Sequence, residues 1–362
     1  MKKNILVTTA LASSLIFIGS NAIAQTKIDG TLALGYKEVI NDLATSKTAN
    51  VRGFGREAQL NISNSGNLNV GGLKYAAGFA LEFDGVSEKN TSGNISIGNE
   101  NTYVDFIAGN TTITFGVDHI QNSDRTAANF VGLNVEDMDN NNTYFLSSIG
   151  ANPKEAIGAG VMQKTPFGTF SALYVPANGV NGGDDDLDGT SEAAQATTVS
   201  NTDRSSAYEI GFVGDLGIKG LNVHYFRNKE KASPGSLNVN KSLAGVNYGV
   251  SYNFGQFTFG VDKKTSEGKY TTTTAEVNSE TDQIAYGLAF AITPTLTLGA
   301  NYAKADTKNV STAVVDEKFK GIALGYNLGP VVAEAQYGQY ESALGVDRAD
   351  GDVYYARLST KF

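Results

Sequence analysis

Apolar and polar positions alternate with a period of two residues along nearly the whole chain after residue 25. In residues 72–84, for example, Leu73 and Tyr75 share one face of an extended strand, whereas Lys74 and Glu82 share the other. Such alternation is typical of β-strands that have one apolar and one polar face. The pattern therefore predicts an all-β protein.

The alternating segments are separated in turn by short connections and by long polar loops. Seven connections are short and rich in Gly, Pro, Asn and Asp, which favour tight turns, and eight are longer. These breaks predict sixteen strands, placed at residues 26–38, 51–63, 72–84, 100–109, 111–118, 155–165, 168–176, 204–214, 220–231, 241–253, 255–266, 280–292, 295–306, 317–327, 330–341 and 351–362. An even strand number with short turns on one side and long loops on the other predicts an antiparallel transmembrane β-barrel, with periplasmic turns and extracellular loops.

The alternation does not by itself say which face points inward, so a secreted soluble all-β protein is an alternative. Such a protein would be divided into several domains, yet the chain has no Pro- or Ser-rich linker. Its 41 glycines suit a smooth, open lumen. Tyrosines near strand ends suit an aromatic girdle at the membrane interface: Tyr36, Tyr103, Tyr174, Tyr225, Tyr302 and Tyr337.

Both ends of the chain agree with a barrel. Residues 1–24 combine Lys2 and Lys3, an apolar run and a small-residue site, which predicts a cleaved signal peptide and a barrel domain at 25–362. Removing this segment leaves 26 basic and 37 acidic side chains, a net charge of −11, which excludes phosphate-driven nucleic-acid binding. The last strand ends in Phe362, and in a closed barrel that strand must pair with the first.

Several segments, in their order and spacing, resemble the general diffusion porins of Gram-negative outer membranes, of the trimeric proteobacterial type. The resemblance is carried by Ile28-Asp29-Gly30-Thr31-Leu32, Gly53-Phe54-Gly55-Arg56-Glu57, Gly72-Leu73-Lys74-Tyr75, Leu81-Glu82-Phe83, Thr165-Pro166-Phe167-Gly168 and Phe362. It implies a homotrimer of water-filled pores for passive diffusion of small hydrophilic solutes. It also implies that the third loop folds inward, and that the barrel assembly machinery reads the terminal aromatic residue as a signal.

The third long connection, residues 119–154, is the longest and is predicted to be the constriction loop; an exposed surface loop is the alternative. Its carboxylates, with the one that precedes it, are Asp118, Asp124, Glu136, Asp137 and Asp139. The pore-wall candidates are Lys37, Arg52, Arg56, Lys74, Glu82, Asp105 and Arg357.

Two of these candidates, Arg52 and Arg56, share a face with Phe54, so they reach the lumen only through a bulge after Gly53. Otherwise they lie at a protein interface. The carboxylates that strict alternation places in the lumen outnumber the basic groups there, which predicts a cation-preferring pore. The carboxylates are Asp29, Glu57, Glu82, Asp84, Asp105, Asp118, Glu209, Asp262 and Glu334, and the basic groups are Lys37, Lys74, Lys241, Lys264 and Arg357.

An acidic segment in the fourth loop, Asp184, Asp186 and Asp188, has the spacing that begins a calcium-binding loop. Its twelfth position is Gln195 rather than glutamate, so a solvated acidic loop is the alternative, able to bridge to lipopolysaccharide through divalent cations. No other cofactor site is expected.

Catalysis is not expected from this sequence. The only histidines are His119 and His224, and neither lies near a nucleophile motif. A substrate-specific barrel and a plugged or purely structural barrel are two further functions that the sequence allows.

Overall fold

The computed structural model describes residues 25–41, 51–83, 98–116, 158–176, 206–230, 242–271, 276–309, 312–341 and 350–362. These form sixteen strands: β1 (Gln25–Asn41), β2 (Val51–Asn67), β3 (Lys74–Glu82), β4 (Gly98–Ala108), β5 (Thr111–Gly116), β6 (Gly158–Thr165), β7 (Gly168–Val175), β8 (Ala207–Gly214), β9 (Leu221–Glu230), β10 (Ser242–Phe254), β11 (Phe257–Thr271), β12 (Glu276–Ala291), β13 (Leu296–Asn309), β14 (Thr312–Asn327), β15 (Val331–Glu341) and β16 (Gly351–Lys361). Within these ranges, no helix is long and apolar enough to cross a membrane.

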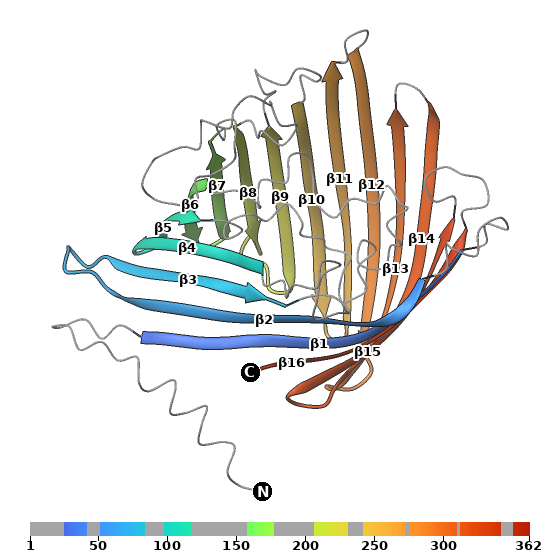
Figure 1. Cartoon of the computed structure of the whole chain (residues 1–362), viewed down its shortest axis with the longest axis horizontal. Helices are drawn as coiled ribbons and strands as arrows, with labels where there is room; N and C mark the ends of the chain where they lie inside the picture. Colours follow the sequence, from blue (N-terminus) through green and yellow to red (C-terminus); the bar gives the residue numbers. More distant parts are fainter. Residues whose placement is uncertain are drawn as a thin grey trace, which may run out of the picture.

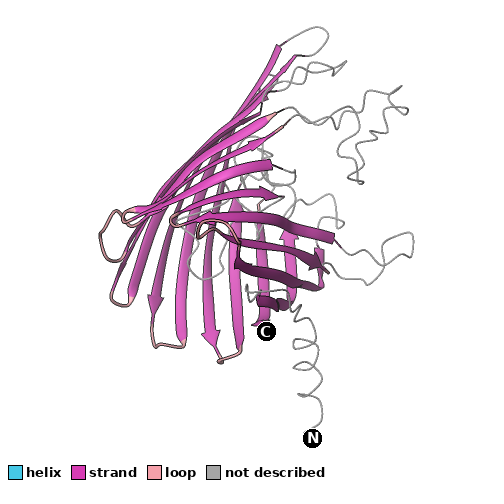
Figure 2. Ribbon diagram, turned by 90° about the vertical axis from the view of Figure 1, so that its left-hand side faces the viewer, coloured by secondary structure: helices cyan, strands magenta, loops and turns pink. Residues whose placement is uncertain are grey.

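The strands form one closed antiparallel barrel in which each pairs with its neighbours in sequence and β1 pairs with β16. Strands on the near and far walls cross in projection, as expected for strands tilted around a barrel axis (Figure 1). The short turns lie together at one end (Figure 2). We call this the turn end and the opposite end the loop end. The predicted barrel and strand number are confirmed.

Several strands continue further toward the loop end than the alternation indicates. The sequence pattern predicts loops at residues 267–279 and 307–316, but β11 and β12 remain paired to Thr271↔Glu276, and β13 and β14 to Asn309↔Thr312. Both faces of these extensions are rich in Thr, Ser, Lys and acidic residues. They therefore lack an apolar period of two, although backbone pairing needs none.

One face of each strand points outward, and in every strand except β15 this face carries large apolar side chains that are exposed on the isolated barrel. Next to the turns, phenylalanines form a row in which the ring centroids of Phe170 and Phe212, and of Phe257 and Phe290, lie 4.7 Å apart. Nearer the loop end a second row consists of Tyr36, Tyr225, Tyr248, Tyr286, Tyr302, Tyr337 and Tyr354. Two such rows bounding an apolar band are typical of a barrel that spans a membrane.

The expected girdle position of Tyr103 is wrong. Tyr103 lies opposite Gly78 and Gly116, in phase with Asp105, on the inner face of β4. The two glycines leave room for it, because a β-carbon added at Gly78 would lie 3.1 Å from Tyr103 Cε1. The bulky residue thus fills a notch in the inner wall instead of facing lipid.

The barrel closes where the chain end meets the first strand. Gly30 and Phe362 exchange both backbone hydrogen bonds, each 3.0 Å long, directly beyond the Thr31↔Lys361 pair. The Phe362 ring lies over Gly30, where an added β-carbon would come within 2.7 Å of Phe362 Cζ and 2.5 Å of the Gln59 carbonyl oxygen. Glycine at position 30 therefore leaves the space that the Phe362 ring occupies.

We expect Gly30→Val to impair closure of the barrel, because the new side chain overlaps the Phe362 ring and the neighbouring backbone. Overpacking of this kind costs about 1–3 kcal/mol. The measurement is the fraction of heat-modifiable, folded barrel after refolding into lipid vesicles. Gly53→Val is the matched control, since an added β-carbon there meets nothing within 4 Å. Equal folded yields for the two variants would contradict the role assigned to Gly30.

Candidate functional site

The inner face of the barrel is polar and carries more acidic than basic groups. Strand register places nine carboxylates of the described residues on it: Asp29, Glu57, Glu82, Asp105, Glu209, Glu230, Asp262, Glu317 and Glu334. Seven basic side chains share this face: Lys27, Lys37, Lys74, Lys164, Lys264, Arg357 and Lys361. The inner wall is therefore net negative in the part of the chain that the structure describes.

The best-defined inner charge pair joins β15 to β16. Arg357 Nη2 lies 2.5 Å from Glu334 Oε2, and Arg357 Nε donates a 2.7 Å hydrogen bond to the same oxygen. The guanidinium carbon also lies 5.9 Å from the centroid of the Tyr355 ring. Because the Glu334 side chain is only 10% exposed, the carboxylate depends on this arginine for its counter-charge.

A cavity of about 440 Å³ opens on the inner side of the seam near the turn end. Its lining includes Glu57, Arg357, Ser359 and Lys361, with Gly329 at the adjoining turn. The cavity is thus lined by side chains of both charges, with space for water and small polar solutes.

The inner wall at β8, β11 and β14 contains buried charged groups. Glu209, Asp262, Lys264 and Glu317, on β8, β11 and β14, are each no more than 2% exposed. His224 is also buried, and its Nε2 lies 2.9 Å from Asn247 Oδ1 across the β9–β10 pair. This histidine faces the lumen, as the alternation predicts, and its bond partner is an amide rather than a nucleophile.

Comparison with known proteins shows which family this sixteen-stranded barrel, with its apolar outer band and charged lumen, belongs to. A model of the family described as Gram-negative porin matches residues 8–343. The chain belongs to this family. The resemblance seen in the sequence is therefore confirmed.

Solved porin structures share the fold at low sequence identity. The anion-selective porin from Comamonas acidovorans has a TM-score of 0.66 at 14% identity, over 94% of this chain and 100% of that one. The loop L8 deletion mutant of OmpT from Vibrio cholerae has a TM-score of 0.63 at 12% identity, over 94% and 99% of the two chains. OmpF of Salmonella typhi gives 0.62 at 12% identity, over 93% and 97%. No curated protein matches the chain.

Membership of the Gram-negative porin family makes the protein a channel for diffusion in the outer membrane, and a channel rather than an enzyme. The short turns then lie on the periplasmic side and the loop end faces outward.

Five predicted pore-wall residues lie on the inner face of this porin: Lys37, Lys74, Glu82, Asp105 and Arg357. They occupy β1, β3, β4 and β16, around the seam and the strands beside it. Arg357 forms the ion pair with Glu334 described above. The effect of these five side chains on ion flow stays a prediction.

The predicted inward bulge that would carry Arg52 and Arg56 into the pore is wrong. The β1–β2 register runs without a break from Gln25↔Ser65 to Val39↔Val51. Arg56 therefore lies opposite Leu34, and Arg52 lies opposite Glu38, on the same outer face as Phe54, which is 78% exposed. Gly53 keeps regular pairing with Lys37, so the expected change of face does not occur.

The remaining predicted site residues lie outside the described residues. These are Asp118, Asp124, Glu136, Asp137 and Asp139 of the predicted constriction loop, and Asp184, Asp186 and Asp188 of the possible calcium site. Within the described residues, no group of three or more acidic, His or Cys side chains could hold a metal ion.

Sequence reasoning missed several inner charges, among them Lys164, Glu230 and Glu317. Glu317 is in phase with Phe319, an aromatic residue that the alternation would assign to lipid but that is fully buried. The signal was nevertheless available, because Ile322 and Leu324 fix the outer phase of β14, and Glu317 has the opposite phase.

We expect Glu334→Gln to shift the zero-current potential of the channel toward anion preference, since it leaves Arg357 as an uncompensated positive charge in the lumen. Loss of the pair should also lower the free energy of unfolding by roughly 1–3 kcal/mol. Glu341→Gln is the matched control, because it removes the same charge from an outward-facing pair with Lys318 and Lys320. An equal shift of the potential in both variants would contradict the assignment.

Proposed function

We propose that this porin is a passive, cation-preferring pore for small hydrophilic solutes and ions. The observation that carries the proposal is the surplus of carboxylates on the described inner wall. A water-filled lumen with fixed negative charge raises the local concentration of cations and repels anions.

The expected result in a planar lipid bilayer is stepwise conductance, with a zero-current potential of the sign that cation preference gives in a KCl gradient. A potential of the opposite sign would contradict the proposed selectivity and leave channel formation intact. Complete absence of conductance from correctly folded protein would instead favour the plugged or purely structural barrel.

The inward-folded third loop is part of this proposal. Residues 119–154 carry Asp124, Glu136, Asp137 and Asp139. Carboxylates at the narrowest point of a pore would strengthen the negative field of the wall. The proposed constriction therefore acts in the same direction as the inner-wall charges.

We also propose a homotrimer with the outer face of β1 and β2 at the subunit contact. In vitro folded OmpT of Vibrio cholerae, which shares the fold with a TM-score of 0.60 at 12% identity, is described in a trimer form. In this chain, Arg56 lies in the apolar band one outer position below Phe54, and its Nε atom is buried without a hydrogen bond among the described residues. An arginine facing lipid costs up to ~2–4 kcal/mol, less toward the interface, and a polar contact from a second subunit would remove that cost.

Arg56→Leu distinguishes the two environments of this side chain. In contact with lipid, leucine would stabilise the barrel, by at most about 2–4 kcal/mol. At a subunit contact, it would remove a polar anchor and lower the temperature at which trimers dissociate on a gel, which is the outcome we expect. Arg52→Leu, opposite Glu38 and beyond the tyrosine row, should change that temperature little. A more heat-stable Arg56→Leu oligomer would contradict the proposed contact.

Secretion and assembly complete the proposal. Residues 1–24 serve as the signal peptide, and Phe362 is the residue that the barrel assembly machinery reads before the barrel closes. The contact between Phe362 and Gly30 supports a second use of the same aromatic residue, because it completes the seam once inserted. Lipopolysaccharide is the proposed lipid partner.

A further inference from the structure

The cavity of about 440 Å³ at the barrel seam, which we call the seam cavity, lies where β15, β16, β1 and β2 meet near the turn end. The inner side chains at its centre are small, since Ser359 has Ala33 on one side and Val332 on the other. Thr360 Oγ1 donates a 2.7 Å hydrogen bond to the Pro330 carbonyl oxygen, which ties β16 to the turn at the edge of the cavity. Small side chains on a fixed backbone therefore leave this space.

Three charged side chains line the seam cavity: Glu57, Arg357 and Lys361. Arg357 is already paired with Glu334, so its charge is compensated. Glu57 and Lys361 are both exposed, and in the part of the chain that the structure describes neither side chain forms a hydrogen bond or an ion pair. The cavity thus contains one free carboxylate and one free ammonium.

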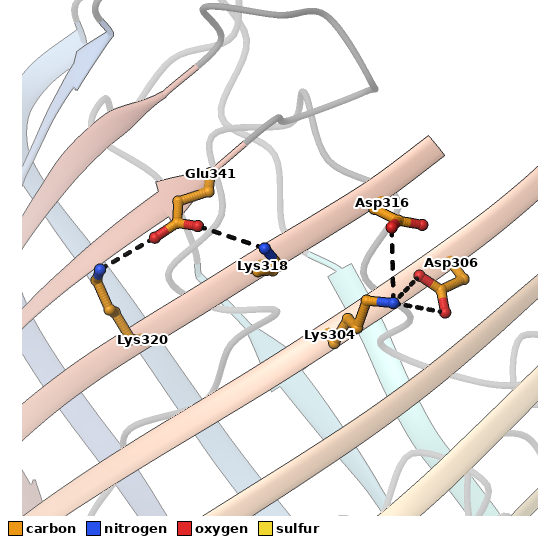
Figure 3. A network of polar contacts seen from close by, with 6 residues as sticks. All are labelled: Lys304, Asp306, Asp316, Lys318, Lys320 and Glu341. Atoms are coloured by element: carbon orange, nitrogen blue, oxygen red, sulfur yellow. Dashed lines mark hydrogen bonds and ion pairs between the residues drawn. The ribbon is translucent and has the colours of Figure 1, made fainter. Parts of the chain in front are cut away.

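Opposite charges on the outer face of the same barrel do pair where the strands bring them close. Lys320 Nζ lies 3.0 Å from Glu341 Oε1, and Lys304 Nζ lies 2.8 Å from Asp306 Oδ1 (Figure 3). The first pair joins the neighbouring strands β14 and β15, and the second joins alternate residues of β13. Glu57 and Lys361 share a cavity without such a contact, so their separation needs a structural reason.

The first strand keeps the two free charges apart. Glu57 pairs with Ala33 of β1, and Ala33 pairs with Ser359 of β16 on its other side. Lys361 lies two residues further along β16. At about 4.8 Å per strand spacing and about 3.4 Å per residue, the backbones of Glu57 and Lys361 are roughly 12 Å apart. The two side chains would meet only if both were extended fully toward each other, which costs rotamer freedom. A small solute that carries one charge of each sign offers both groups a partner without this cost.

We infer that the seam cavity is a binding site for small zwitterionic solutes, namely free α-amino acids and dipeptides, at the periplasmic mouth of the pore. The ammonium of the solute binds Glu57 and its carboxylate binds Lys361, through charge-assisted hydrogen bonds. The hydroxyl of Ser359 offers a neutral donor and acceptor to the rest of the solute. The volume of the cavity lies within the ~300–1,000 Å³ that is typical of small-molecule sites. The inference rests on the mouth of the proposed pore being open to solutes, and it is independent of the proposed ion preference.

The test is a ligand-detected NMR titration of the purified mature protein in detergent with the dipeptide L-alanyl-L-alanine. Two analogues each lack one charge, because the N-acetyl dipeptide has no ammonium and the dipeptide amide has no carboxylate. Wild type should bind the zwitterion saturably and each analogue about fivefold more weakly, which is the loss expected for one exposed charge contact. This comparison of ligands needs no variant, so it decides the matter for a substitution that impairs folding.

The variants E57Q and K361Q show which side chain holds which end of the solute. E57Q should weaken binding of the zwitterion about fivefold and leave binding of the N-acetyl analogue within about twofold of wild type, because that analogue has no ammonium. K361Q should show the same pattern with the amide analogue, which has no carboxylate. The matched controls remove the same charges from other parts of the inner face, with K164Q on β6 and E230Q on β9. Both controls should bind the zwitterion within about twofold of wild type.

Equal losses for all three ligands in E57Q or K361Q would overturn the inference, since they would report a general change of lumen charge. It would also be overturned by control variants that lose as much affinity, or by wild type that binds either analogue as well as the zwitterion. Single-channel conductance of the same preparations tests the pore separately. A conducting protein without saturable dipeptide binding would overturn this inference and leave the proposed pore intact. A folded protein that binds the dipeptide as expected but does not conduct would contradict the proposed pore and support the binding site.

Discussion

The structure depends on one constraint, which is that backbone N–H and C=O groups inside a membrane must be paired within the protein. An unpaired group in hydrocarbon costs several kcal/mol, so a sheet can cross only when it has no edge. Pairing of β1 with β16 removes the last edge, and the exchange of hydrogen bonds between Gly30 and Phe362 extends that pairing to the final residue. The close contact between the two explains why an aromatic chain end requires a glycine opposite it.

Closure of the barrel also fixes whether each charged side chain faces the lumen or the outside, because successive side chains of a β-strand point to opposite faces. Glu334 and Arg357 point into the lumen, whereas Glu341 and Lys320 point outward, although each set is held by similar ion pairs. The same carboxylate–cation chemistry therefore faces the lumen in one case and the outside of the barrel in the other. Arg56 follows the same rule: an unbroken register fixes it outside, so the environment must adapt to the arginine.

The strand number, antiparallel order and inner positions of Lys74, Asp105 and Arg357 could all be predicted from alternation, because each lies in a strand whose opposite face is apolar. Prediction from alternation failed at large aromatic residues that lie on the inner, mostly polar face. Tyr103 and Phe319 point inward because glycines opposite or beside them leave space, and that is a property of the neighbouring strands. The side of Arg56 depends on whether a bulge interrupts pairing, and a single sequence does not encode that visibly.

The loop-end extensions of β11 to β14 are strand segments that the sequence pattern predicts to be loops. Polar residues on both faces hid these strands, since a period of two is visible only when one face is apolar. Polarity on both faces is also what carries a paired strand out of the apolar band into the headgroup layer. The absence of alternation in these segments is thus itself a sign of strands that have left the membrane but not the sheet.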